Sequence, residues 1–115
     1  NGFLSADDWN YPTIEHVRDI VVSEHRDKYN LVDVLTGDTR AMYLRALLTI
    51  SGETPMSVDA YPNARFLYIY SKLPIEQIIS GQLWEVSVIK PVKLLKQWHI
   101  KKDINLYLVE RVSKD

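Results

Sequence analysis

Residues 83–112 read LWEVSVIKPVKLLKQWHIKKDINLYLVERV and contain the clearest structural pattern in the chain. From residue 104 onward two faces alternate, with Ile104, Leu106, Leu108 and Glu110 on one and Asn105, Tyr107, Val109 and Arg111 on the other. This period of two predicts a β-strand over residues 104–112, and the apolar run over residues 83–89 predicts a second strand. The stretch therefore predicts a half-buried sheet in the second half of the chain.

Residues 90–102, between the two apolar runs, contain five lysines and no acidic residue. If Pro91 begins a short helix, three of these lysines fall on one side of it and apolar residues fall on the other. The segment also fits an exposed connection or an edge strand, where lysines oppose aggregation between sheets. A basic surface suits phosphate groups, acidic proteins or membrane surfaces. The candidate basic binding patch consists of Lys90, Lys93, Lys96, Trp98, Lys101 and Lys102.

The first half of the chain is predicted to be mainly helical. Residues 1–12 show no periodicity and are expected to form an irregular arm. Apolar residues at helical spacing predict a helix over residues 13–28, although its β-branched residues also fit a strand. Residues 31–35 fit either a short helix or a strand. Residues 40–51 are rich in helix formers and precede Gly52, which predicts the best-defined helix of the chain.

The second half is predicted to supply the sheet. Residues 53–63 contain two prolines and little pattern, which predicts a long loop. The sequence RFLYIYS at residues 65–71 predicts a strand, and residues 74–81 predict one or two helical turns. We therefore expect residues 13–115 to form a single α+β domain. In it, two or three N-terminal helices would pack on a C-terminal antiparallel sheet of three to four strands.

The composition is typical of one globular domain. The chain has 115 residues, of which 46% are hydrophobic and 25% charged, and this length supports one core. We expect no transmembrane segment, because no apolar run reaches the roughly 18 residues that cross a bilayer. The absence of cysteine excludes disulfides and thiolate chemistry, so we expect an intracellular, cytoplasmic protein. The chain begins at Asn1 rather than at Met, which suggests a trimmed domain, a processed product or a cloning remnant.

Charge is unevenly distributed along the chain, although the net charge is only −1. Residues 1–39 carry eight acidic and three basic residues, and residues 40–115 carry seven acidic and eleven basic residues. The near-neutral total excludes the global basicity of many nucleic-acid binders. The opposite charge of the two halves can still steer an encounter with a partner, and it would allow head-to-tail self-association.

The sequence offers few residues for catalysis. His16, His25 and His99 form no metal-binding motif, and the nine-residue separation of the first two places them on different faces of a helix. The four glycines form no phosphate-binding loop. A small hydrolase that uses His16 or His25 with a carboxylate is the least favoured alternative. We expect no enzymatic activity, no catalytic residue, no metal site and no cofactor.

Two segments resemble known families. RFLYIYSKLPIEQIISG, followed by WEV, resembles the middle strands of PUA-like ASCH domains, which are small β-barrels associated with RNA. The glycine-lysine-glutamate pattern expected upstream in that family is missing, so no functional residue is carried over. LTGDTRAMYLRALLTISG resembles the helix pair of rhabdovirus-type matrix proteins, which self-assemble. The two resemblances are incompatible with each other, and neither identifies the chain.

We expect a non-enzymatic protein–protein interaction or assembly module, in a viral-matrix-like or subunit-type role. Its partner would be another protein or a second copy of the chain, which would make a homo-oligomer. The alternative is a module that binds nucleic acid or another acidic surface through the candidate basic binding patch. Peripheral contact with a membrane stays open.

Overall fold

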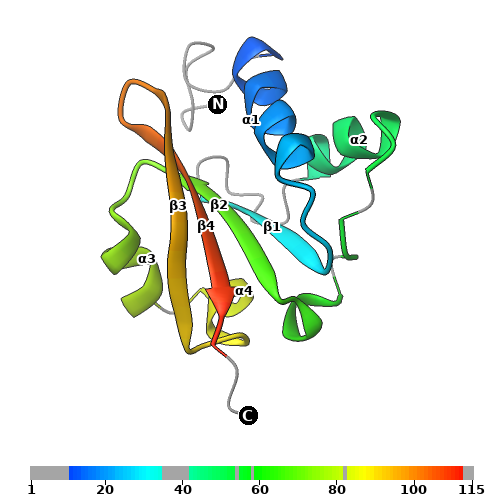
Figure 1. Ribbon diagram of the computed structural model, residues 1–115. Helices are drawn as coiled ribbons and strands as arrows, with labels where there is room; N and C mark the ends of the chain where they lie inside the picture. Colours follow the sequence, from blue (N-terminus) through cyan, green and yellow to red (C-terminus); the bar gives the residue numbers. More distant parts are fainter. Residues whose placement is uncertain (1–10, 35–41, 54, 58, 82, 113–115) are drawn as a thin grey trace.

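The computed structural model describes residues 11–34, 42–53, 55–57, 59–81 and 83–112. Its elements are, in order, α1 (Tyr11–Glu24), β1 (Tyr29–Asp33), α2 (Met42–Ile50), the 3₁₀ turn η1 (Tyr61–Asn63), β2 (Phe66–Ser71), α3 (Ile75–Ser80), α4 (Trp84–Ser87), β3 (Val92–Lys101) and β4 (Ile104–Arg111). The strands form one sheet in the order β1-β2-β4-β3 (Figure 1). β1 runs parallel to β2, whereas β4 runs antiparallel to both β2 and β3.

Helices cover both faces of this sheet (Figure 1). On one side α1 and α2 contribute Ile14, Val17, Val21, Leu44 and Leu48 to a core cluster. On the other side α3 and α4 contribute Ile75, Ile78 and Val86 to a second cluster. Because both faces are covered, every position of β1 and β2 is buried. This double burial explains why the sequence of β2 is almost continuously apolar.

β4 confirms the alternation predicted from the sequence. Leu106 and Leu108 belong to the cluster beneath α1 and α2, whereas Tyr107 and Val109 belong to the cluster beneath α3 and α4. Neighbouring residues of a strand point to opposite faces, so β4 joins the two cores. The α+β class, with N-terminal helices packed on the sheet, is confirmed.

Several local predictions are also confirmed. The first helix is present as α1, which begins two residues earlier than predicted, at Tyr11, and ends four residues earlier, at Glu24. α2 ends before Gly52, whose φ of 87° suits the residue that follows a helix. Residues 31–35, which fit either a helix or a strand, form a strand over residues 31–33, as part of β1. Because β1 runs parallel to β2, the sheet is mixed rather than purely antiparallel. Leu35 lies outside the described residues. Residues 1–10, most of the predicted arm, and residues 40–41 lie outside the described residues.

Two predictions for the stretch 83–112 need correction. The predicted strand over residues 83–89 is wrong, because this segment contains the short helix α4. Leu83, Val86 and Ile89 recur every third residue and contact the same core cluster, which is a helical spacing. The helix considered for the lysine-rich segment is also wrong. That segment forms β3, and the alternative interpretation as an edge strand is confirmed.

A buried arginine fixes the long connection between α2 and β2. Arg45 is only 8% exposed, and its Nη1 donates to the carbonyl oxygen of Met56 at 2.6 Å. Its Nη2 donates to the hydroxyl of Tyr61 at 2.9 Å and to Oδ1 of Asn30. Tyr61 in turn donates its hydroxyl proton to the carbonyl oxygen of Leu31 at 2.5 Å. The predicted loop is therefore held by a polar network in the interior.

Two buried tyrosine hydroxyls, those of Tyr29 and Tyr68, have no hydrogen-bond partner among the described residues. The two rings meet edge to face with their centroids 5.5 Å apart. Burial raises the pKa of both phenols well above the ordinary value of 10.0. The carboxylate of Glu53 raises the pKa of Tyr29 further, and that of Glu24 raises the pKa of Tyr68.

We expect the free energy of unfolding to fall as the pH rises above about 10. The unfolded chain then releases its tyrosine protons while the buried tyrosines keep theirs, which costs up to about 1.4 kcal/mol per pH unit for each tyrosine. Tyr68→Phe should make this fall shallower. At neutral pH it should be neutral or stabilising, because an unpaired buried hydroxyl costs about 1–3 kcal/mol. Urea unfolding at neutral and alkaline pH measures both effects.

Tyr107→Phe is the matched control for this prediction. The hydroxyl of Tyr107 is also on a buried residue, but it donates to the carbonyl oxygen of Leu73 at 2.8 Å. Its removal should cost about 1 kcal/mol at neutral pH. An equal loss in Tyr68→Phe would contradict the assignment of an unpaired hydroxyl.

Candidate anion-binding site

The structure spreads the candidate basic binding patch along the whole length of β3. Lys90 precedes the strand, Lys93 lies near its start, Lys96 lies at its middle, and Lys101 is its last residue. Lys93 and Lys101 are about 26 Å apart along the chain, because an extended strand rises about 3.3 Å per residue. The six residues therefore do not form one compact surface.

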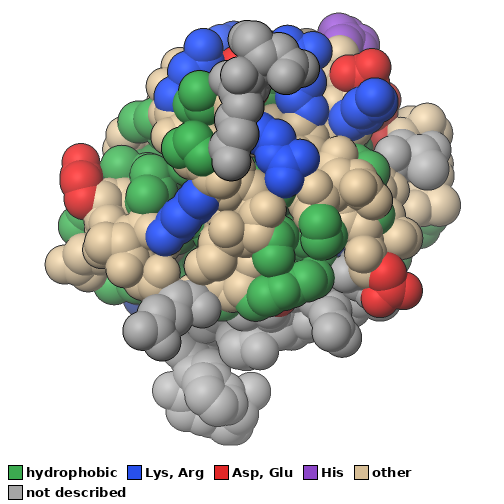
Figure 2. Space-filling view, turned by 90° about the horizontal axis from the view of Figure 1, so that it is seen from below, with side chains coloured by type: hydrophobic (Ala, Val, Ile, Leu, Met, Phe, Trp, Pro, Cys, Tyr) green, Lys and Arg blue, Asp and Glu red, His purple; other side chains and the backbone are tan. Residues whose placement is uncertain are grey.

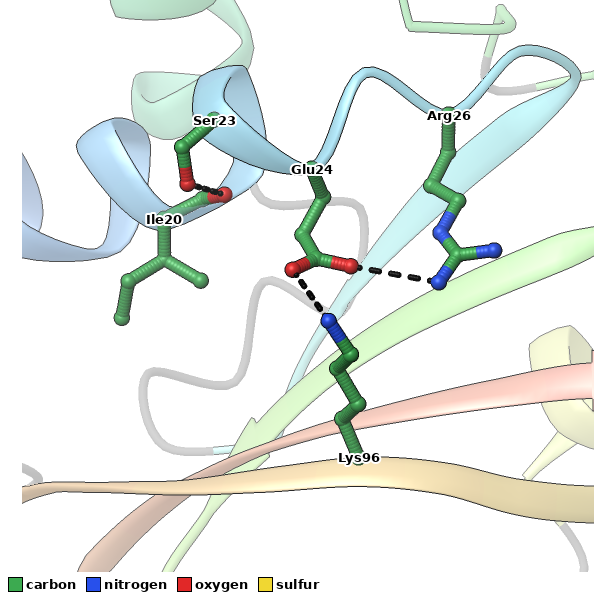
Figure 3. A network of polar contacts seen from close by, with 5 residues as sticks. All are labelled: Ile20, Ser23, Glu24, Arg26 and Lys96. Carbon is green, nitrogen blue, oxygen red and sulfur yellow. Dashed lines mark hydrogen bonds and ion pairs between the residues drawn. The ribbon is translucent and has the colours of Figure 1, made fainter.

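Lys96 is held by an ion pair with the end of α1. Its Nζ lies 2.8 Å from Oε2 of Glu24, and Nη2 of Arg26 lies 3.2 Å from Oε1 of the same carboxylate (Figure 3). Burial acts to raise the pKa of Glu24, but the hydrogen bonds and charges of Lys96 and Arg26 outweigh it and hold the pKa below its ordinary value. Lys96 therefore joins β3 to α1 through a carboxylate that it shares with Arg26.

Trp98 and the two lysines of the hairpin also lie apart from the start of β3. Trp98 is half-buried and packs against Tyr68, with ring centroids 6.5 Å apart. Lys102 follows β3 in the turn to β4 and has a φ of 50°. Its carbonyl oxygen contacts Nε2 of His99. Trp98 thus belongs to the packing of the sheet, and Lys101 and Lys102 occupy the opposite end of β3 from Lys93.

Lys90 and Lys93 line a pocket at the end of the sheet where β2 and β3 begin and β4 ends. The volume of this pocket is about 850 Å³. We call it the basic pocket. Its described lining consists of Arg65, Val88, Lys90, Pro91, Lys93, Glu110, Arg111 and Val112. Figure 2 views the molecule from this end and shows several lysine and arginine side chains gathered in one half of the face.

Backbone pairing positions the walls of the basic pocket. The amide of Arg111 donates to the carbonyl oxygen of Arg65 at 2.9 Å, which places the end of β4 beside the start of β2. The amide of Val112 donates to the carbonyl oxygen of Pro91 at 2.8 Å, which places the residue before β3 beside the residue after β4. Residues far apart in the sequence are thereby brought to one end of the sheet.

One carboxylate, that of Glu110, lies among four cations in the described lining. Its Oε2 lies 3.0 Å from both Nε and Nη2 of Arg65, and its Oε1 lies 3.7 Å from Nζ of Lys93. The side chains of Arg65 and Lys93 are 61% and 62% exposed, whereas that of Glu110 is 15% exposed. Because ion pairs exposed to this degree are weak, an incoming anion can compete for both cations.

The remaining cations of the basic pocket are placed by backbone carbonyl groups. Nη2 of Arg111 donates to the carbonyl oxygen of Val88 at 3.1 Å, and Nζ of Lys90 donates to that of Gly81 at 3.4 Å. The guanidinium of Arg65 also lies over the ring of Phe66, 5.1 Å from its centroid. A stacked guanidinium keeps its orientation while it presents donors to an anion. The pocket therefore holds partly oriented donors before any anion arrives.

Comparison with protein-family models, curated proteins and solved structures finds no significant match. The described residues contain no group of three or more side chains able to hold a metal ion. His16, His25 and His99 are all exposed and lie on separate elements or turns. Among the described helices, none combines the length and the apolar character that a membrane crossing requires.

Sequence reasoning found Lys90 and Lys93 but missed Arg65 and Arg111. The two arginines border predicted strands, so their positions were visible in the sequence. Only the antiparallel pairing of β2 with β4, in the observed register, brings them together. The available signal was the presence of a cation at the start of one predicted strand, Arg65, and of another at the end of a second predicted strand, Arg111.

Proposed function

We propose that this domain is a binding module for nucleic acid and that the basic pocket is its contact site. The observation that carries the proposal is the gathering of Arg65, Lys90, Lys93 and Arg111 around one recess with a single described carboxylate, Glu110. Phosphate contacts by lysine and arginine supply most of the affinity in sequence-independent binding of nucleic acid. A locally basic site can act in this way although the net charge of the chain is −1.

The arrangement favours phosphate over carboxylate. A carboxylate has two coplanar oxygens, which one guanidinium can bind side by side. In the basic pocket Glu110 instead places only Oε2 against Arg65, and its Oε1 faces Lys93. The cations of the basic pocket come instead from three strand ends and from the connection that follows α4. A tetrahedral phosphate can accept hydrogen bonds from several of these directions at once.

The test measures the binding of a labelled single-stranded oligonucleotide by fluorescence anisotropy at several salt concentrations. We expect the logarithm of the affinity to fall linearly with the logarithm of the salt concentration, by about 0.7 for each phosphate neutralised. Poly-glutamate of similar charge serves as a competitor. Equal competition by poly-glutamate would assign the pocket to an acidic protein instead, and no binding at low salt would refute the proposal.

Glu110→Gln should raise the affinity for the oligonucleotide by about threefold to tenfold. The substitution removes the carboxylate that competes with phosphate for Arg65 and Lys93. Glu76→Gln makes the same change of charge on α3, outside the lining of the pocket, and serves as the control. Unchanged or weaker binding by Glu110→Gln, measured in the same titration, would argue against competition at Glu110.

The assembly role expected from the sequence stays a prediction with less support. β3 is an edge strand, but its lysines and its two register shifts disfavour pairing with a second copy. The pair between Glu24 and Lys96 also joins opposite charges of the two halves within one chain. Light scattering over a concentration and salt series measures whether the chain self-associates.

A further inference from the structure

We infer that the basic pocket binds the terminal phosphate of a nucleic-acid strand rather than the internal backbone. The inference rests on the proposed function and specifies its ligand. A protein that follows an internal backbone needs cations repeated along a groove or stripe. Here four cations gather at one end of the sheet: Arg65, Lys90, Lys93 and Arg111. The described lining around them contains one acidic residue, Glu110.

The other lysines of β3 do not extend the pocket into a track. Lys96 is the next lysine along the strand, and its ammonium group lies 2.8 Å from the carboxylate of Glu24, closer than the 3.7 Å between Lys93 and Glu110. The side chain of Lys96 is also less exposed than that of Lys93, 49% against 62%, so an incoming anion competes less readily for Lys96. Lys101 lies at the far end of the strand, about 26 Å from Lys93 at about 3.3 Å per residue. A strand that entered the pocket would therefore meet few free cations beyond it along β3.

The charge of the pocket matches a strand end. Its described lining carries four cations and one carboxylate, which leaves an excess of three positive charges. A phosphate monoester carries about −1.5 to −2 at neutral pH, whereas each internal phosphodiester carries about −1. A terminal monoester with its neighbouring diester therefore balances the excess within one recess. An internal segment would need three diesters to do the same.

The size and the donors of the pocket fit the same ligand. The volume of about 850 Å³ lies within the range of about 300–1,000 Å³ that small-molecule pockets occupy, so it has room for one terminal nucleotide with its phosphates. A monoester offers three non-bridging oxygens, whereas a diester offers two. The guanidinium groups of Arg65 and Arg111 and the ammonium groups of Lys90 and Lys93 supply donors from separate walls.

The experiment compares four single-stranded oligonucleotides of one sequence and length, bearing a 5′-phosphate, a 3′-phosphate, hydroxyl groups at both ends, or no ends because the strand is circular. We expect one of the two phosphorylated strands to bind at least about tenfold more tightly than the hydroxyl-ended and circular strands. The reason is that the terminal phosphate adds a charge-assisted hydrogen bond, whose energy corresponds to at least about that factor in affinity. Arg111→Gln and Arg65→Gln should each reduce this preference to below about threefold. Lys101→Gln, with the same loss of charge at the far end of β3, should retain it.

Inorganic phosphate, titrated against the bound strand, separates the anion from the nucleotide that carries it. Competition by phosphate alone at millimolar concentration would support the assignment of the pocket to a monoester. Equal binding of all four strands would overturn the inference while leaving nucleic-acid binding in place. Retention of the preference in both arginine variants would also overturn it, with their folding checked by circular dichroism. Failure of every strand to bind would instead refute the proposed function.

Discussion

The double variant Arg65→Glu/Lys93→Glu should bind single-stranded nucleic acid at least about 100-fold more weakly than the unmodified protein. Each substitution replaces a cation by an anion, so the excess of three positive charges in the described lining becomes an excess of one negative charge. The loss combines two charge-assisted contacts, each worth about 1.5–3 kcal/mol, with repulsion between the new carboxylates and phosphate. Fluorescence anisotropy at low salt measures the change in Kd.

The control for this variant is Lys101→Glu/Lys102→Glu. It changes the net charge by the same amount, but both residues lie at the opposite end of β3 from the pocket. We expect the control to weaken binding by less than about fivefold, because charges beyond about 10 Å are largely screened at moderate salt. Similar losses in the two double variants would mean that net charge, rather than the basic pocket, determines affinity.

Both double variants should remain folded. The side chains of Arg65 and Lys93 are mostly exposed, and exposed ion pairs contribute about 0–1 kcal/mol to stability. Glu110, whose side chain is 15% exposed, loses two cationic partners in the pocket variant. Lys93→Glu also places a like charge directly opposite Glu110 across β3 and β4, which costs up to about 1 kcal/mol. A thermal melting point close to that of the unmodified protein would therefore assign the lost affinity to the site itself.

The parts of the fold that the sequence predicts are those with two unlike faces or a distinct boundary. β4 alternates because Leu106 and Leu108 enter one core while Tyr107 and Val109 enter the other. α2 is bounded by Gly52, whose positive φ is readily adopted by glycine. Such local signals can be recognised in the sequence without knowledge of which residues are neighbours in space.

The parts that the sequence left open or mispredicted depend on what lies against them. β1 is buried at all five positions, so its apolar residues have no period that distinguishes a strand from a buried helix. α4 is only four residues long, and its helical spacing is read only when the core beneath it is known. The β-branched residues of the segment 83–89, which are Val86, Val88 and Ile89, favour a strand by propensity, and packing overrides that preference.

Two of the four cations of the basic pocket could be predicted from the sequence, and the other two could not, for a related reason. Lys90 and Lys93 are close in sequence, so charge clustering alone found them. The same clustering grouped them with Lys96 and Lys101, which an extended strand then carried away from the pocket. Arg65 and Arg111 joined the site through strand pairing, which the composition of neither segment reveals. Local charge therefore indicates that a basic site exists, and topology determines its members.

Topology also explains why an interior arginine should dominate the stability of this domain. Arg45 links α2 to β1 through Asn30 and to η1 through Tyr61. It also links α2 to the connection between α2 and η1, through the carbonyl oxygen of Met56. Truncation would remove the guanidinium donor from all three acceptors, of which Oδ1 of Asn30 would keep the amide of Leu31 as a donor at 2.9 Å. It would also open space beside the ring of Tyr61, whose centroid lies 5.7 Å from the guanidinium carbon.

We expect Arg45→Ala to lower the free energy of unfolding by about 3 kcal/mol or more, because each unsatisfied buried polar group costs about 1–3 kcal/mol. Urea unfolding measures this loss as a lower midpoint at an unchanged slope. The control is Arg18→Ala on α1, where the guanidinium pairs with the exposed neighbouring Asp19 at 2.9 Å, and its cost should stay below about 1 kcal/mol. If the two variants unfolded at the same urea concentration, Arg45 would not be the anchor of the connection between α2 and β2. We expect Arg45→Ala to lose stability relative to Arg18→Ala and to retain nucleic-acid binding under conditions in which it stays folded. This result would separate the role of Arg45 in stability from the role of Arg65 in binding.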